Sequence, residues 1–154
     1  MQLSDILSAD AIRSNVRISG KKRLLQDLSE LAASVYALDA TAVYEGLQAR
    51  ESLGPTGVGR GVAIPHARLS GLTEVIAVFE KLEKPIDFES VDRKPVDLVF
   101  ALLAPEEAGV EHLKALARVS RTLRDDSICA KLRSTNDPAA LFAILTDHQS
   151  SQAA

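Results

Sequence analysis

The sequence predicts an α/β fold, a three-layer α/β/α sandwich in which helices flank a mixed β-sheet on both sides. The order of apolar patterns is strand, two helices, three strands and three helices, which favours this class. Segment 96–104 is apolar at almost every position, as is typical of a central strand covered on both faces. A chain of 154 residues with 46% hydrophobic and 25% charged residues fits one globular domain. We therefore expect a single domain over 1–148 and a frayed tail over 149–154.

The chain begins with a strand and an amphipathic helix. The strand is expected around residues 12–18, where short apolar groups occur. From Lys21 onward the apolar residues recur at steps of four and three, which is the spacing of one helix face. The residues of this face are Leu24, Leu28, Leu31, Val35 and Leu38.

A second helix follows and places an arginine on its apolar face. Asp39 can cap its start, and the Gly-Pro pair at 54–55 ends it. Val43 and Leu47 share one face, and Arg50 is the next position on that face. Such an arginine either extends its charged end to water near the helix C-terminus or lines a site.

Glycines are concentrated in the segment that follows this helix. Four of the eight glycines fall within residues 54–61, and residues 62–66 then read as a short strand stopped by Pro65. Glycine amides can approach a ligand closely. The alternative is a tight connection between helix and strand. A nucleotide-binding loop is excluded, because a strand follows instead of a helix and no Gly-Lys-Ser/Thr closes the loop.

The rest of the chain supplies two strands and three helices. The strands are expected at 75–79 and 96–104, with a loop or edge strand at 85–95 between them. Apolar steps of four and three predict a helix over 110–123. The remaining start signals are Asp125 or Asp126 for a short helix and Asp137-Pro138 for the last one.

Composition excludes several classes of function. A net charge of −3 argues against nucleic-acid binding, which needs a cationic surface. The single cysteine, Cys129, cannot form an internal disulfide, so we expect a reducing, cytoplasmic compartment. One cysteine and three histidines argue against a zinc site, and we expect no metal and no cofactor. The longest apolar stretch is too short for membrane insertion.

Three side chains together would suit a phosphoryl group. His66 follows Pro65 at the end of a predicted strand, and His112 lies in the first turn of a predicted helix, on its apolar face. An imidazole can accept a phosphoryl group, and the guanidinium of Arg50 matches its oxygens. A second imidazole can donate a hydrogen bond. Taken singly, each histidine could have a purely structural role, His66 as a surface residue and His112 as a buried neutral ring. His148, near the C-terminus, is expected to be inert, and Cys129 to be a small core residue.

Residues 51–67, Glu-Ser-Leu-Gly-Pro-Thr-Gly-Val-Gly-Arg-Gly-Val-Ala-Ile-Pro-His-Ala, resemble a known signature. It is that of the phosphotransferase-system EIIA domains of the mannitol/fructose type. Within this family the chain is most similar to the nitrogen-related branch, EIIA-Ntr. The similarity includes 21–23, 64–69, 85–88, 94–103 and 111–113. Many members of this branch have Gly after the active histidine, where this chain has Ala67.

The resemblance implies that His66 is phosphorylated, on Nε2, and that Arg50 and His112 line its pocket. It implies a phosphotransfer protein rather than a free-standing turnover enzyme. The phosphodonor would be an HPr-like protein charged by Enzyme I from phosphoenolpyruvate. The regulatory targets would include potassium-transport or sensor-kinase proteins.

Two alternatives remain open at this point. The chain could be a sugar-specific EIIA that passes phosphate to the EIIB of a mannitol or fructose permease. It could also be a non-phosphorylated interaction module, although the intact set of Arg50, His66 and His112 argues against that. No residue is evident that would activate water for a hydrolase.

Overall fold

The computed structural model describes the backbone of residues 1–153 and the side chains of residues 1–147. Its elements follow in chain order. They are η1 (Leu3–Asp5), β1 (Leu7–Val16), α1 (Lys21–Tyr36), α2 (Ala40–Glu51), β2 (Gly57–Gly59), β3 (Val62–Ala63), β4 (His66–Leu69), β5 (Ile76–Ile86), β6 (Val96–Pro105), α3 (Gly109–Leu123), α4 (Asp126–Arg133) and α5 (Pro138–Ala153).

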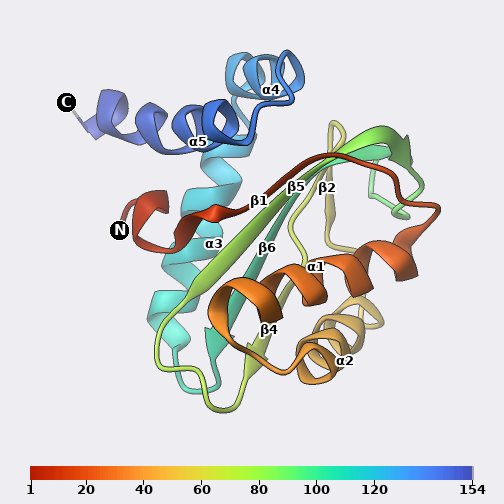
Figure 1. Cartoon of the computed structure of the whole chain (residues 1–154), viewed down its shortest axis with the longest axis vertical. Helices are drawn as coiled ribbons and strands as arrows, with labels where there is room; N and C mark the ends of the chain where they lie inside the picture. The colour runs from red at the N-terminus through yellow and green to blue at the C-terminus, as the bar shows by residue number, and fades with distance from the viewer. Residues whose placement is uncertain (154) are drawn as a thin grey trace.

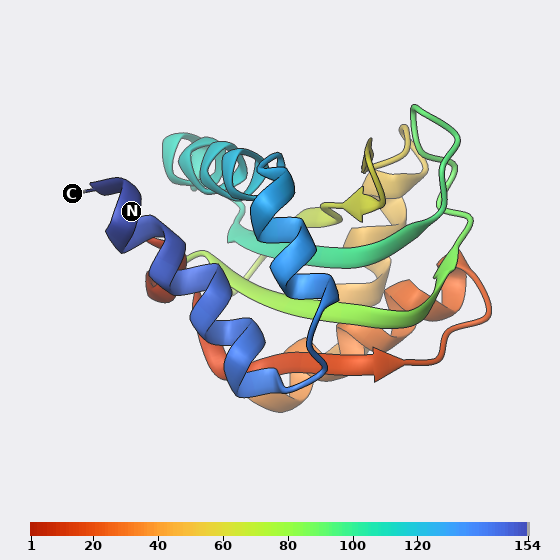
Figure 2. The same cartoon turned by 90° about the horizontal axis from the view of Figure 1, so that it is seen from above.

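The strands form one mixed sheet, as predicted. Its order is β1-β5-β6-β3-β2, and β4 also pairs with β6. β1 and β5 are parallel, β5 and β6 are antiparallel, and β3 and β4 both run parallel to β6. Helices α1 and α2 cover one face, while α3, α4 and α5 cover the other (Figures 1 and 2). The predicted α/β/α sandwich is therefore confirmed.

The central strand is β6, also as predicted. It has neighbours on both edges, and only Asp97 and Pro105 along it are more than marginally exposed. Phe100 on β6 meets Phe79 on β5 edge to face, with ring centroids 6.1 Å apart. Leucine, isoleucine, valine and alanine fill most of the remaining core, in keeping with the low aromatic content.

Helix starts follow the predicted caps. The carboxylate of Asp39 accepts from the backbone N–H of Thr41 at 3.1 Å, and Asp125 caps α4 in the same way. Asp137 accepts from the N–H of Ala139 at 3.2 Å at the start of α5. These contacts satisfy backbone donors that have no partner inside the helix.

The first strand differs from the prediction at both ends. β1 begins at Leu7 rather than near residue 12, and it ends at Val16. Its first half contains Ser8 and Asp10, so apolar periodicity does not reveal it. Backbone pairing with β5 orders this half instead.

The prediction that His66 ends a strand is wrong, because His66 begins β4. Pro65 lacks an N–H, so the regular strand is interrupted after Ala63. The register against β6 nevertheless continues, with Ala63 opposite Val99 and His66 opposite Leu102. The carbonyl of Pro65 still accepts from the N–H of Leu102 at 2.9 Å. His66 is therefore the first residue of the resumed strand, and its backbone is fixed by the pairing with β6 and by the hydrogen bond of the preceding Pro65.

Two expectations concern the C-terminal end of the chain. The side chain of His148 and the expected tail 149–154 lie outside the part whose side chains are described, so both expectations stay predictions.

Within the described chain, no helix combines the length and apolar character needed to cross a bilayer.

Candidate functional site

The candidate site lies at strand β4, whose one pairing partner among the described strands is β6. Alternate residues of a strand face opposite sides, so His66 and Arg68 share one face while Ala67 faces the other. On the Ala67 side α2 packs very closely: a Cβ at Gly46 would lie 3.3 Å from the Cβ of Ala67. An edge strand lets side chains from helices on both faces of the sheet converge on it.

His66 is held in one tautomer by its own backbone. Its Nδ1 lies 2.9 Å from the carbonyl oxygen of Ile64, which can only accept a hydrogen bond, so Nδ1 carries the proton. Nε2 then keeps its lone pair. Burial lowers the pKa of His66, the Ile64 contact opposes this, and the charge of Arg50 lowers the pKa further. The ring is therefore a neutral nucleophile at pH 7.

His112 reaches the same place from the first turn of α3. Its ring centroid is 5.5 Å from that of His66, in an edge-to-face arrangement with an interplanar angle of 68°. His112 is only 5% exposed, and burial lowers its pKa, with the neighbouring His66 ring and the charge of Arg68 as smaller causes. Among the described residues, nothing forms a hydrogen bond with its buried Nε2.

Arg50 approaches from the last turn of α2. It is half-buried, and its Nη1 donates to the carbonyl of Gly54 at 3.0 Å. Its positive charge is a smaller cause of the lowered pKa of His66, after burial. The three residues singled out from the sequence are thus brought together, although they come from α2, β4 and α3.

An ion pair between partly exposed Lys21 and buried Glu51 supports the backbone that leads to His66. The carboxylate of Glu51 accepts from the N–H of Thr56 at 2.8 Å and pairs with Nζ of Lys21 at 2.8 Å. The carbonyl of Thr56 accepts from the N–H of Ile64 at 2.9 Å, and Ile64 in turn orients His66. Sequence reasoning gave Glu51 no role beyond its place in the signature.

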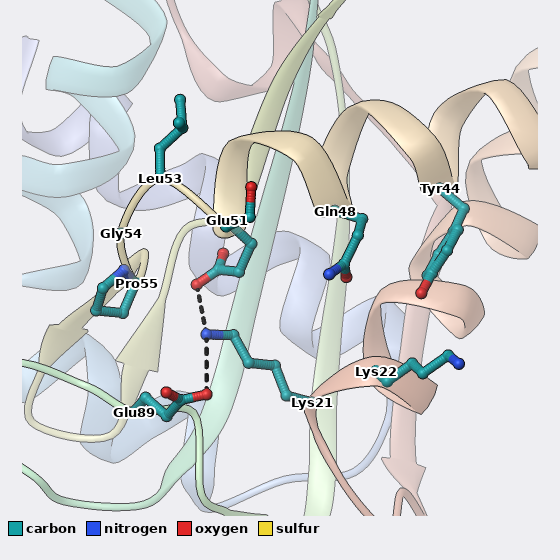
Figure 3. Close-up of a pocket in the computed structure, with 10 residues that line it drawn as sticks. Lys21, Lys22, Tyr44, Gln48, Glu51, Leu53, Gly54, Pro55 and Glu89 are labelled. Atoms are coloured by element: carbon teal, nitrogen blue, oxygen red, sulfur yellow. Dashed lines mark ion pairs between the residues drawn. The ribbon is translucent and has the colours of Figure 1, made fainter.

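A hollow of about 590 Å³ lies beside this ion pair, but it is not the histidine site. It opens between the start of α1, the end of α2 and the loop at 53–55 (Figure 3). Lys21 crosses it and contacts both Glu51 and, at 3.8 Å, Glu89. Neither His66 nor His112 lines it.

Most of the glycine segment builds a hairpin, which supports the reading of a tight connection. Arg60 and Gly61 form its two-residue turn with φ values of 58° and 80°, as a type I′ turn requires. A Cβ on Gly61 would come within 2.5 Å of Arg133. Gly54 is the glycine whose carbonyl joins the site, through Arg50.

Arg68 is a site residue that sequence reasoning missed. Its Nε donates to Nδ1 of His112 at 3.2 Å. The available signal was its position two residues after His66 on an extended segment, which predicts the same face of the strand. The periodicity of the sequence did not indicate which helix would meet that face.

The described residues provide neither a metal-binding cluster nor an exposed thiol at this site. Over residues 1–147, no three His, Cys, Asp or Glu side chains form a group that could hold a metal ion. Cys129 is a free, buried core residue, as expected, and burial raises the pKa of its thiol.

Comparison with known proteins finds similarity over nearly the whole chain. Residues 5–148 match the family described as phosphoenolpyruvate-dependent sugar phosphotransferase system, EIIA 2. The nitrogen regulatory protein of Bradyrhizobium diazoefficiens is 48% identical over 145 residues, which cover 94% of this chain and 95% of that protein. That of Escherichia coli K12 is 43% identical over 148 residues, covering 96% and 91%. The crystal structure of nitrogen regulatory protein IIA-Ntr from Neisseria meningitidis gives a TM-score of 0.88 at 37% identity, covering 94% of this chain and 99% of that one.

Proposed function

The chain belongs to the EIIA type 2 family of the phosphoenolpyruvate-dependent sugar phosphotransferase system, and from that membership we propose that it is a regulatory phosphocarrier of the nitrogen-related system. His66 accepts a phosphoryl group from an HPr-like protein, and the phosphorylated and free forms signal differently to partner proteins. The observation that carries this proposal is the pair of imidazoles. One keeps its lone pair on Nε2, and the other has a buried Nε2 that has no hydrogen-bond partner within residues 1–147.

The proposed transfer moves the phosphoryl group between two imidazole nitrogens. The lone pair on Nε2 of His66 forms the new P–N bond while the P–N bond of the donor phosphohistidine breaks. The donor nitrogen keeps the electron pair of the broken bond. The His66 ring becomes more positive as it is phosphorylated, and the Ile64 carbonyl stabilises the proton on Nδ1.

Arg50 and His112 stabilise the transferred group. The phosphoryl oxygens carry close to two negative charges, which a guanidinium matches with its forked donors. The Nε2–H of His112 supplies a further hydrogen bond. Both side chains are in place before transfer, so little reorganisation is needed.

The surface around the site suits a docking protein. Leu53, Val110 and Leu113 are 82%, 64% and 64% exposed, although all three are apolar. Leu53 precedes the Gly54 that contacts Arg50, while Val110 and Leu113 flank His112 on α3. Adding about two charges beside apolar contacts can make or break an interface. We propose potassium-transport or sensor-kinase proteins as the regulatory targets, in the cytoplasm.

Incubation with Enzyme I, an HPr-like protein and labelled phosphoenolpyruvate tests the proposal. We expect stoichiometric label in the peptide that contains His66, and none in folded His66→Ala protein. Label on His112 would reverse the two roles, and no label at all would favour the interaction module. Rapid passage of the label to a fructose or mannitol EIIB would favour the sugar-specific alternative.

A further inference from the structure

Arg68 forms a hydrogen bond with one nitrogen of the His112 ring. A guanidinium has only donors and stays protonated at any ordinary pH. Its Nε lies 3.2 Å from Nδ1 of His112, so Nδ1 must be the accepting nitrogen. A neutral imidazole carries one N–H, which is therefore on Nε2.

The resulting Nε2–H is an unusual group in a folded protein. His112 is 5% exposed, and its Nε2 has no hydrogen-bond partner among the described residues. Leaving a buried donor unpaired costs free energy, so nearly all such groups are satisfied in native structures. An acceptor that arrives only during function would account for it. A phosphoryl oxygen on neighbouring His66 is such an acceptor.

We infer that Arg68 is a positioning residue of the phosphoryl site, which holds His112 as the Nε2–H tautomer that donates to the phosphoryl group on His66. The inference rests on the proposed function. Arg68 and His66 share one face of β4, so a single strand sets both the acceptor and the residue that orients its helper. Arg68 itself does not need to touch the phosphoryl group.

The charge of Arg68 acts in the same direction as its hydrogen bond. Burial lowers the pKa of His112, and the interactions with the neighbouring His66 ring and with the charge of Arg68 lower it further. A charged ring would carry protons on both nitrogens and could not accept from Arg68. The contact therefore favours a neutral ring with one defined donor.

The first arm of the test measures the tautomer in the free protein. The ¹⁵N shifts of the His112 ring distinguish Nε2–H from Nδ1–H without any phosphodonor. We expect the wild-type ring to be almost entirely Nε2–H. Arg68→Met should introduce a clear fraction of Nδ1–H, and Arg68→Lys should restore most of the wild-type state. Arg121→Met is the matched control, because Arg121 is an exposed arginine on α3 itself. An unchanged tautomer in Arg68→Met would overturn the inference.

The second arm measures phosphoryl acceptance by the same variants. Arg68→Met should slow the transfer about tenfold, an effect typical of one lost hydrogen bond to a charged group. Arg121→Met should accept phosphate at the wild-type rate. A shifted tautomer with unchanged transfer would contradict the positioning role. Failure of wild-type protein to accept phosphate would refute the proposed function. The tautomer measurement would still test whether Arg68 sets the proton position on His112. Since Arg68 is exposed, all variants should unfold at similar temperatures.

Discussion

Replacing Glu80 by glutamine should stabilise this protein at neutral pH. Glu80 is fully buried on β5, and its oxygens have no hydrogen-bond partner among the described residues. It lies opposite Arg13 of β1, whose guanidinium is bound to Asp27 of α1 at 2.9 Å. The pKa of Glu80 is raised to about 9, chiefly by burial and then by Asp27, while the charges of Arg13 and Glu30 act as smaller, opposing effects. When it is protonated, Glu80 can donate a hydrogen bond to the carboxylate of Asp27.

The size of the effect follows from this pKa. The folded protein keeps the proton at pH 7, whereas the unfolded chain releases it above its ordinary pKa of 4.5. Stability therefore falls as pH rises from 4.5 towards 9, by about 1.4 kcal/mol for each pH unit. The loss amounts to about 3 kcal/mol at pH 7. Glutamine is neutral at every pH and can still donate to Asp27, so Glu80→Gln should recover this free energy.

Urea unfolding at several pH values measures the effect. The free energy of unfolding of Glu80→Gln should exceed that of wild type by about 3 kcal/mol at pH 7, and the difference should grow with pH up to about 9. The control is Glu83→Gln on the same strand, which loses only a surface pair with Arg17 and should change stability by less than about 1 kcal/mol. A destabilised Glu80→Gln protein, or a difference that does not change with pH, would show that Glu80 is ionised and paired, and would refute the reasoning.

Further predictions concern the site. Arg50→Ala should slow phosphoryl acceptance roughly 10- to 100-fold, as loss of a charge-assisted contact implies. The free energy of unfolding of Arg50→Ala should change by less than about 1 kcal/mol. Arg50→Lys should restore only part of the rate. Single-turnover labelling measures the rates of both variants, and an unchanged Arg50→Ala rate would contradict the role of Arg50. Phosphorylation of His66 places negative charge beside His112 and should raise the pKa of His112 above its lowered value in the free protein, as an NMR titration of both forms would detect; an unchanged pKa would mean that the charge lies elsewhere. His112→Gln keeps a donor but cannot titrate, so the lifetime of its phosphohistidine should depend less steeply on pH than in wild type. Leu113→Asp should raise KM for the HPr-like donor while leaving kcat within about twofold, and an unchanged KM would place the docking surface elsewhere.

Much of the fold could be predicted from local patterns. The helix face that begins at Leu24, the cap at Asp39 and the apolar run of β6 depend on neighbours a few residues apart. Periodicity and capping depend on local backbone geometry, so they can be recognised without the tertiary structure. The missed first half of β1 shows the limit of this approach, because an edge strand can be ordered by pairing alone.

The candidate site was only partly predictable. His66, Arg50 and His112 stood out by position and by resemblance, and the structure brings them together. The start of β4 at His66, by contrast, follows from pairing with β6, a strand far away in the sequence. The contact between Arg68 and His112 joins residues 44 positions apart.

By itself, the sequence determined the element types, the central strand and the candidate phosphoryl acceptor, because each rests on residue types at fixed local spacing. Only the tertiary structure decided which nitrogen of each histidine carries the proton, because this depends on the Ile64 carbonyl for His66 and on Arg68 for His112. It also decided that Glu80 is buried against Asp27 while Glu83 of the same strand pairs with Arg17 nearer the surface. Side chains of the same type behave differently at these positions because burial and partners, which come from distant segments, set their protonation.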